Sequence, residues 1–101
     1  MPVDSPVVAP PDLLATVQGI VSEVLMVPAA SVQLNSRLHD LGAESIDYLD
    51  LLFRIEEVIG RKVPVSRWET FVNERLPGAN LAEAITVAFV AEFAEGERRR
   101  S

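Results

Sequence analysis

The chain has 101 residues, a length that suits one domain with one hydrophobic core, and its 49% hydrophobic and 6% aromatic residues predict a core that is mainly aliphatic. The absence of cysteine and the presence of only one histidine exclude disulfides, cysteine nucleophiles and metal sites with several thiolate or histidine ligands. Fifteen acidic and nine basic residues give a net charge of −6, which argues against nucleic-acid binding and favours a basic partner.

The N-terminal residues 1–11 contain four prolines and little helical periodicity, so we predict a flexible leader there. They have neither the basic start nor the continuous apolar run of a signal peptide. No apolar stretch approaches the roughly 18 residues that a transmembrane helix needs. We therefore expect a cytoplasmic, monomeric protein that does not insert into membranes.

The first predicted helix ends near residue 27. Its apolar residues recur at the spacing of one helix face, Asp12 has the side chain of an N-cap, and Pro28 disfavours helical geometry at the residue before it. The segment 28–44 forms a long connection, and a connection of this length is usually pinned to the core or functional. Its apolar anchors are Val32, Leu34, Leu38 and Leu41.

Three further helices are predicted after this connection. The second covers residues 45–59 and ends before Gly60, since glycine readily adopts the left-handed backbone that terminates helices. A shorter third helix lies near 66–75 and a fourth covers 80–95, with a Pro-Gly break between them.

No segment alternates in the way a strand would, so the predicted fold class is all-α. Three long helices and one short helix, with the long loop between the first two, make a four-helix bundle over residues 12–95. The C-terminal residues 96–101 include three consecutive arginines and are predicted to be a flexible tail.

The acidity of the chain is concentrated around the second helix. Between residues 40 and 60 there are six acids and one base, Arg54, which gives a local net charge of −5. Acids near a helix start also favour its dipole, so charge alone does not separate a docking surface from a solvated face. Most other residues of this helix are apolar, which predicts either deep burial or an apolar surface for a partner. The acids are Asp40, Glu44, Asp47, Asp50, Glu56 and Glu57.

The block from Asp40 to Asp47 reads Asp-Leu-Gly-Ala-Glu-Ser-Ile-Asp. A leucine-glycine pair leads into an acid, a serine and an aliphatic residue, and this pattern resembles the signature of the acyl carrier proteins. The resemblance covers residues 12–95 and is most specific over 40–64. It implies the acyl-carrier type of four-helix bundle, with the Ser45 hydroxyl esterified by 4′-phosphopantetheine, whose thiol carries an acyl group.

The same resemblance implies roles for residues around Ser45. It implies docking to the basic surfaces of partners by Glu44, Asp47, Asp50, Glu56 and Glu57, and contacts with the arm or the acyl chain by Ile46, Leu49 and Phe53. The implied partners are a phosphopantetheinyl transferase and the acyl-loading, elongating or acyl-transfer enzymes of fatty-acid, specialised-lipid or polyketide synthesis. Two features depart from the pattern: Glu44 stands where aspartate is commoner, and Arg54 places a base among the acids, where it would affect which partners dock.

Other interpretations of Ser45 follow from the residues alone. A serine at a helix start is commonly an N-cap with no further role. A nucleophile with His39 as its base is disfavoured, because the sequence has no glycine-rich segment for an oxyanion site, so we expect a substrate of other enzymes rather than an enzyme. Two alternatives stay open: a peptidyl or aminoacyl carrier, although Ala43 and Glu44 favour an acyl carrier, and an acidic interaction module without a cofactor.

The length of the segment 64–81 is similar to that of specialised carriers, including those of very-long-chain acyl groups for lipid A.

Overall fold

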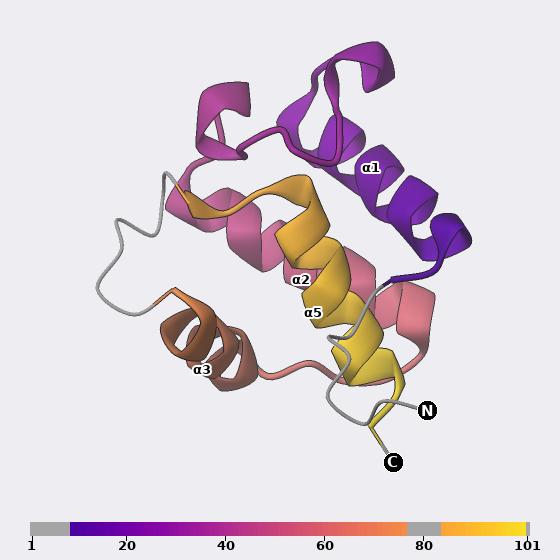
Figure 1. Cartoon of the computed structure of the whole chain (residues 1–101), viewed down its shortest axis with the longest axis vertical. Helices are drawn as coiled ribbons and strands as arrows, with labels where there is room; N and C mark the ends of the chain where they lie inside the picture. Colours follow the sequence, from indigo (N-terminus) through magenta and orange to yellow (C-terminus); the bar gives the residue numbers. More distant parts are fainter. Residues whose placement is uncertain (1–8, 77–83, 101) are drawn as a thin grey trace.

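The computed structural model describes residues 9–76 and 84–100, so most of the predicted leader 1–11 lies outside the described residues (Figure 1). Within that part of the chain the structure has no strand and only an isolated backbone bridge, which confirms the all-α class. The elements are α1 (Pro11–Leu25), the 3-10 turns η1 (Ala29–Ser31) and η2 (His39–Leu41), α2 (Ser45–Ile59), α3 (Val65–Arg75) and α5 (Val87–Arg98).

Three helices form the packed body of the molecule. α1 packs against both α2 and α5, and α2 also packs against α5, which crosses over it in Figure 1. The core is mainly aliphatic, as the composition predicts. None of the helices in the described part of the chain has the length and apolar character that crossing a membrane requires. The most deeply buried core side chains include Val17 and Val21 of α1, Leu51 and Ile55 of α2, and Val87 and Val90 of α5.

α3 lies to one side of this body and reaches it through large side chains rather than through close backbone approach (Figure 1). Aromatic ring centroids lie 4.9–5.8 Å apart in the contacts that join Trp68 and Phe71 of α3 to Phe89 and Phe93 of α5. The two helices are also joined by the ion pairs Arg67–Glu97 (3.1 Å) and Arg75–Glu92 (3.5 Å). The aromatic rings therefore act as spacers that hold α3 at a distance from the body.

The long connection between α1 and α2 is pinned to the body, as predicted. Three of its four predicted apolar anchors are buried or partly buried, whereas Leu34 is 38% exposed. Leu38 donates its N–H to the carbonyl of Ile85 at 3.0 Å, which ties the connection to the segment before α5. Gly42 ends η2 with a left-handed backbone (φ 92°) and turns the chain into α2, a conformation that glycine adopts without steric cost.

The boundaries of α2 and α3 match their predictions closely, whereas α1 starts earlier than predicted and ends two residues before the predicted end near residue 27. It begins at Pro11 with Pro10 as its N-cap, so Asp12 lies inside the first turn rather than capping it. Proline suits the first residue of a helix, here Pro11, because it has no N–H to leave unpaired and its φ is already helical. The helix ends at Leu25 because Met26 adopts left-handed backbone (φ 57°).

The last helix begins at Val87, later than the start near residue 80 that its apolar spacing predicted. Thr86 has extended backbone and forms the isolated bridge with Arg37, which helical geometry would not allow. Its hydroxyl caps α5 by accepting a hydrogen bond from the Phe89 N–H at 3.1 Å. The first residues of the predicted helix, 80–83, lie outside the described residues.

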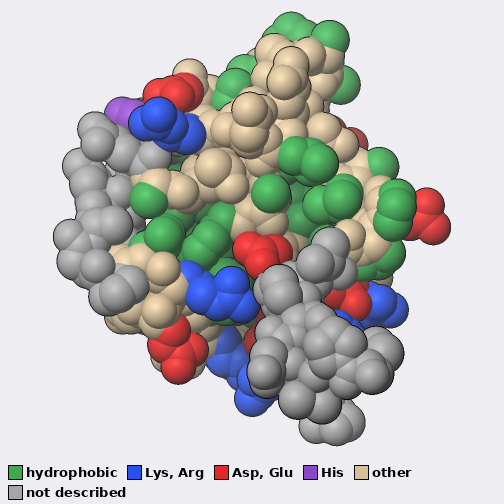
Figure 2. Space-filling model, in the orientation of Figure 1, with side chains coloured by type: hydrophobic (Ala, Val, Ile, Leu, Met, Phe, Trp, Pro, Cys, Tyr) green, Lys and Arg blue, Asp and Glu red, His purple; other side chains and the backbone are tan. Residues whose placement is uncertain are grey.

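α5 also extends to Arg98, three residues beyond the predicted end at Glu95. Glu95 and Glu97 are buried, and the Glu95 carboxylate accepts a hydrogen bond from Nε of Arg98 at 2.7 Å. Basic side chains at a helix C-terminus also offset the helix dipole. On the face shown in Figure 2, several Lys and Arg side chains lie in the lower part of the molecule. The helix includes the first three residues of the predicted tail 96–101.

Candidate functional site

The first turn of α2 presents Ser45 to solvent. Glu44, rather than Ser45, is the N-cap of the helix. The Glu44 N–H donates to Oδ2 of Asp47 at 2.8 Å, and the Asp47 N–H donates to the Glu44 carbonyl at 2.9 Å. Because residues 44 and 47 hold the turn, the Ser45 hydroxyl takes no part in capping; it is exposed and makes no hydrogen bond within the described part of the chain.

The helical register of α2 divides its residues among three faces. The face in the core consists of Leu51, Leu52 and Ile55. The face toward α3 carries Ser45, Tyr48, Leu49 and Leu52, which follow the spacing i, i+3, i+4 and i+7. The outward face carries the exposed residues Ile46, Asp50, Phe53 and Glu57. The helix is therefore neither wholly buried nor a simple solvated face.

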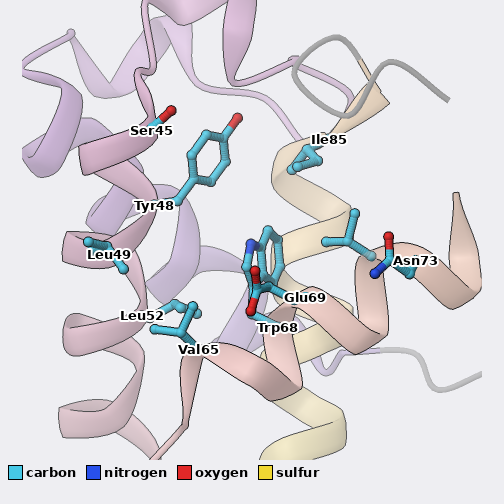
Figure 3. Close-up of a pocket in the computed structure, with 10 residues that line it drawn as sticks. Ser45, Tyr48, Leu49, Leu52, Val65, Trp68, Glu69, Asn73 and Ile85 are labelled. Atoms are coloured by element: carbon cyan, nitrogen blue, oxygen red, sulfur yellow. The ribbon is translucent and has the colours of Figure 1, made fainter.

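A pocket of about 420 Å³ lies between α2 and α3, within the range of about 300–1,000 Å³ that is usual for small-molecule sites (Figure 3). On the face shown in Figure 2, hydrophobic side chains lie in a hollow beside α3. The lining residues are Ser45, Tyr48, Leu49 and Leu52 of α2, Val65, Trp68, Glu69, Val72 and Asn73 of α3, and Ile85. The pocket thus joins an exposed serine hydroxyl to a largely apolar interior.

Tyr48 and Trp68 face each other across this pocket. Their rings are stacked, with centroids 6.2 Å apart and an angle of 25° between the planes. Burial, and to a smaller extent the negative charge of Asp47, raise the pKa of the Tyr48 hydroxyl above its ordinary value. The phenol therefore stays protonated, and able to donate a hydrogen bond, throughout the neutral pH range.

The five acids predicted to dock partners have different surroundings. Two of them form the hydrogen-bonded pair at the start of α2. The carboxylate of Glu56 accepts a hydrogen bond from the Val63 N–H at 2.6 Å, so it holds the connection between α2 and α3. Asp50 and Glu57 are exposed and have no side-chain partner among the described residues. These two carboxylates are the ones that a partner could engage without breaking a bond inside the protein.

The base within the acidic region is itself paired. Nη1 of Arg54 lies 2.7 Å from Oε2 of Glu23 in α1, and both side chains are largely exposed. An exposed pair of this kind adds little stability, but it offsets the positive charge of Arg54 locally. The outward face of α2 therefore keeps its acidic character.

Of the three residues predicted to contact the arm or the acyl chain, the structure brings only Leu49 to the pocket. Ile46 and Phe53 are 66% and 62% exposed and lie on the outward face of α2. Tyr48 and Leu52 also line the pocket but were not among the predicted site residues, although they follow Ser45 at the spacing of one helix face.

We predict that Glu56 stabilises the fold and that Glu57 does not. Glu56→Ala should lower the free energy of unfolding by about 1–2 kcal/mol, because the Val63 N–H loses its charged acceptor. Glu57→Ala is the matched control and should change this free energy by less than about 0.5 kcal/mol. Urea unfolding followed by circular dichroism measures both values. Equal effects of the two substitutions would contradict the structural role of Glu56.

We also predict that Tyr48, the single tyrosine of the chain, ionises at a higher pH in the folded protein than in urea. Ultraviolet absorbance of the tyrosinate measures both midpoints. Because folding raises this pKa, the free energy of unfolding is unaffected by Tyr48 ionisation below the unfolded pKa of about 10, and it falls as the pH rises from there through the folded pKa. Tyr48→Phe should abolish the absorbance change of the tyrosinate and the part of the fall in the free energy of unfolding at high pH that Tyr48 causes. A folded midpoint at or below the unfolded one would overturn the prediction.

Comparison with known proteins agrees with this geometry. The family described as "phosphopantetheine attachment site" matches residues 15–71, more than half of the chain. The acyl carrier protein AcpXL of Rhizobium etli is 36% identical over 59 residues, which cover 57% of this chain and 64% of the relative. The acyl carrier protein of Helicobacter acinonychis is 37% identical over 62 residues, which cover 60% and 80%. The AcpXL protein of Brucella melitensis is 43% identical over 37 residues, which cover 37% and 40%.

The alignments thus span less than two thirds of the length of these AcpXL proteins and 80% of the Helicobacter acinonychis protein. The matched region includes α2 and most of α3, the two helices that enclose the pocket. On the extent of this match, the chain belongs to the acyl carrier protein family, the family of phosphopantetheine attachment sites.

Proposed function

We propose that this chain holds acyl groups on 4′-phosphopantetheine attached to Ser45 and delivers them to partner enzymes. Membership of the family implies the covalent cofactor, whose terminal thiol supplies the thioester chemistry when it is bound. The observation that carries the assignment to Ser45 is its position. Its exposed hydroxyl lies at the first residue of α2 and also lines the pocket between α2 and α3.

The residues around Ser45 fit a phosphate ester. The first N–H groups of a helix have no carbonyl partner within it and form the positive end of the helix dipole, so they favour a negative group at this point. Because Asp47 is engaged by the Glu44 N–H, the turn is held without the serine hydroxyl, which remains accessible to a modifying enzyme. The apolar side chains of the pocket would exclude water from an acyl chain bound between α2 and α3.

The outward face of α2 supports docking to basic partner surfaces. Asp50 and Glu57 provide charge that speeds encounter, while Ile46 and Phe53 provide exposed apolar area beside it. The partners we propose are a phosphopantetheinyl transferase and the acyl-loading, elongating or acyl-transfer enzymes of fatty-acid, specialised-lipid or polyketide synthesis. In this proposal the partners perform the bond-making steps. The cytoplasmic location and the monomeric state stay predictions.

Intact-mass spectrometry tests the attachment site. After co-expression with a phosphopantetheinyl transferase, the protein should gain the mass of one phosphopantetheine group. Ser45→Ala should abolish the gain, whereas Ser66→Ala, which removes an exposed serine near the start of α3, should leave it intact. A modification that persists in Ser45→Ala, or no gain with any transferase tried, would refute the assignment.

We also predict that the acids on the outward face of α2 affect the rate at which the arm is attached. Asp50→Lys combined with Glu57→Lys should slow arm attachment by roughly tenfold at low salt, because attraction to a basic enzyme becomes repulsion. This difference should shrink as the ionic strength rises above about 0.15 M. Helicity measured by circular dichroism should change little, since neither carboxylate has a partner in the described structure.

The matched control makes the same change of charge elsewhere. Asp12→Lys combined with Glu74→Lys alters two exposed acids of α1 and α3 and should leave the rate of attachment near that of the wild type. Equal slowing by both pairs would show that net charge matters and that the outward face of α2 has no special role.

A further inference from the structure

The hydroxyl of Tyr48 is buried and has no hydrogen-bond partner among the described residues. It is the single buried side-chain oxygen or nitrogen without a hydrogen bond in the part of the chain that the structure describes. Folding removes such a group from water, and native proteins pair nearly all buried hydroxyls for this reason. The other polar residues of the pocket, Ser45, Glu69 and Asn73, are exposed and can bond to water. Tyr48 therefore differs from them in carrying a buried polar atom whose hydrogen-bonding capacity is unused among the described residues.

The position of this hydroxyl indicates which part of a ligand would meet it. Tyr48 lies three residues after Ser45 on the same face of α2. In Figure 3 its ring extends from α2 into the pocket, and its oxygen points toward the end where Ser45 lies and away from Trp68. Leu52 and Val65 lie toward the other end. A chain that enters from Ser45 thus meets the phenol before it meets this apolar lining.

We propose that the pocket selects acyl chains with an oxygen substituent close to the thioester, the 3-hydroxyacyl class, and that Tyr48 determines this preference by bonding to that oxygen. This inference rests on the proposed attachment of the arm at Ser45. A hydroxyl on the chain can both donate to and accept from the phenol. A saturated chain buries the same apolar surface but offers no partner at this point, so it leaves the phenol unpaired. The apolar remainder of a 3-hydroxyacyl chain suits the far end of the pocket.

Protection of the thioester tests the preference. The full chain is loaded with the arm carrying either a saturated medium-length acyl group or its 3-hydroxy counterpart, and loading is verified by intact mass. Each thioester is then cleaved with hydroxylamine. Dividing the rate for the same acyl group on free pantetheine by the rate on the protein gives a protection factor, which removes the intrinsic difference between the two thioesters. Emission of Trp68, the single tryptophan of the chain and part of the pocket, reports chain insertion independently.

In the wild type, the 3-hydroxyacyl chain should be protected about fivefold more than the saturated chain, the change in an equilibrium constant that one hydrogen bond typically supplies. Tyr48→Phe keeps the ring and should make the two protection factors equal. Equal protection of the two chains in the wild type would overturn the inference whether or not the variant folds. If Tyr48→Phe lowered the protection factors of both chains equally, the inference would also be overturned, because Tyr48 would then bond to a group that every acylated arm contains.

Failure of this inference is distinct from failure of the proposed function. If the wild type cannot be loaded at Ser45, the carrier function itself is refuted, and intact mass shows this before any rate is measured. If loading succeeds and the chains are protected equally, the carrier function stands and the preference for an oxygen substituent falls.

Discussion

The two hydrogen bonds between residues 44 and 47 determine where α2 begins, and the rest of the site depends on that starting point. If α2 began one residue later, Ser45 would be its N-cap and its hydroxyl would turn toward the helix backbone. With the observed start, Ser45 is the first helical residue and its hydroxyl is free of any capping role. The same register sends one row of side chains into the core, one toward α3 and one outward, so a single helix contributes to the fold, to the pocket and to the exposed acidic face.

The pocket is bordered on one side by α3, which contacts the body through aromatic side chains. Trp68 and Phe71 pack against Phe93 of α5, and Trp68 also lines the space beside Ser45. The ion pair between Arg67 and the buried Glu97 anchors the same helix at its N-terminal half. Glu56 fixes the connection that leads into α3. The position of α3 therefore rests on a few long side chains, which leaves a solvent-accessible space lined by apolar groups.

Local signals predicted α2 from residue 45 to 59, because the Leu-Gly-Ala-Glu-Ser block and Gly60 lie next to its ends in the sequence. Ser45 could be singled out for the same reason. The start of α5 could not be predicted in this way, since Thr86 is held extended by a bridge to Arg37, far away in the chain. The role of Glu56 also depends on tertiary structure: its partner, the Val63 N–H, comes near only after the chain turns at Gly60. Charge patterning located the acidic surface but could not separate its structural carboxylates from its free ones.

Asp47 influences both the helix start at Ser45 and the pocket residue Tyr48. Its carboxylate accepts the Glu44 N–H that fixes the first turn, and its charge also adds to burial in raising the pKa of the neighbouring Tyr48. The group that fixes the first turn thus also adds, less strongly than burial, to the raised pKa of the phenol. A lysine or arginine at residue 47 would remove both effects together: the first turn would lose its acceptor, and a positive charge beside the phenol would favour the tyrosinate. The acid two residues after the serine is therefore part of the pocket chemistry as well as of the helix cap.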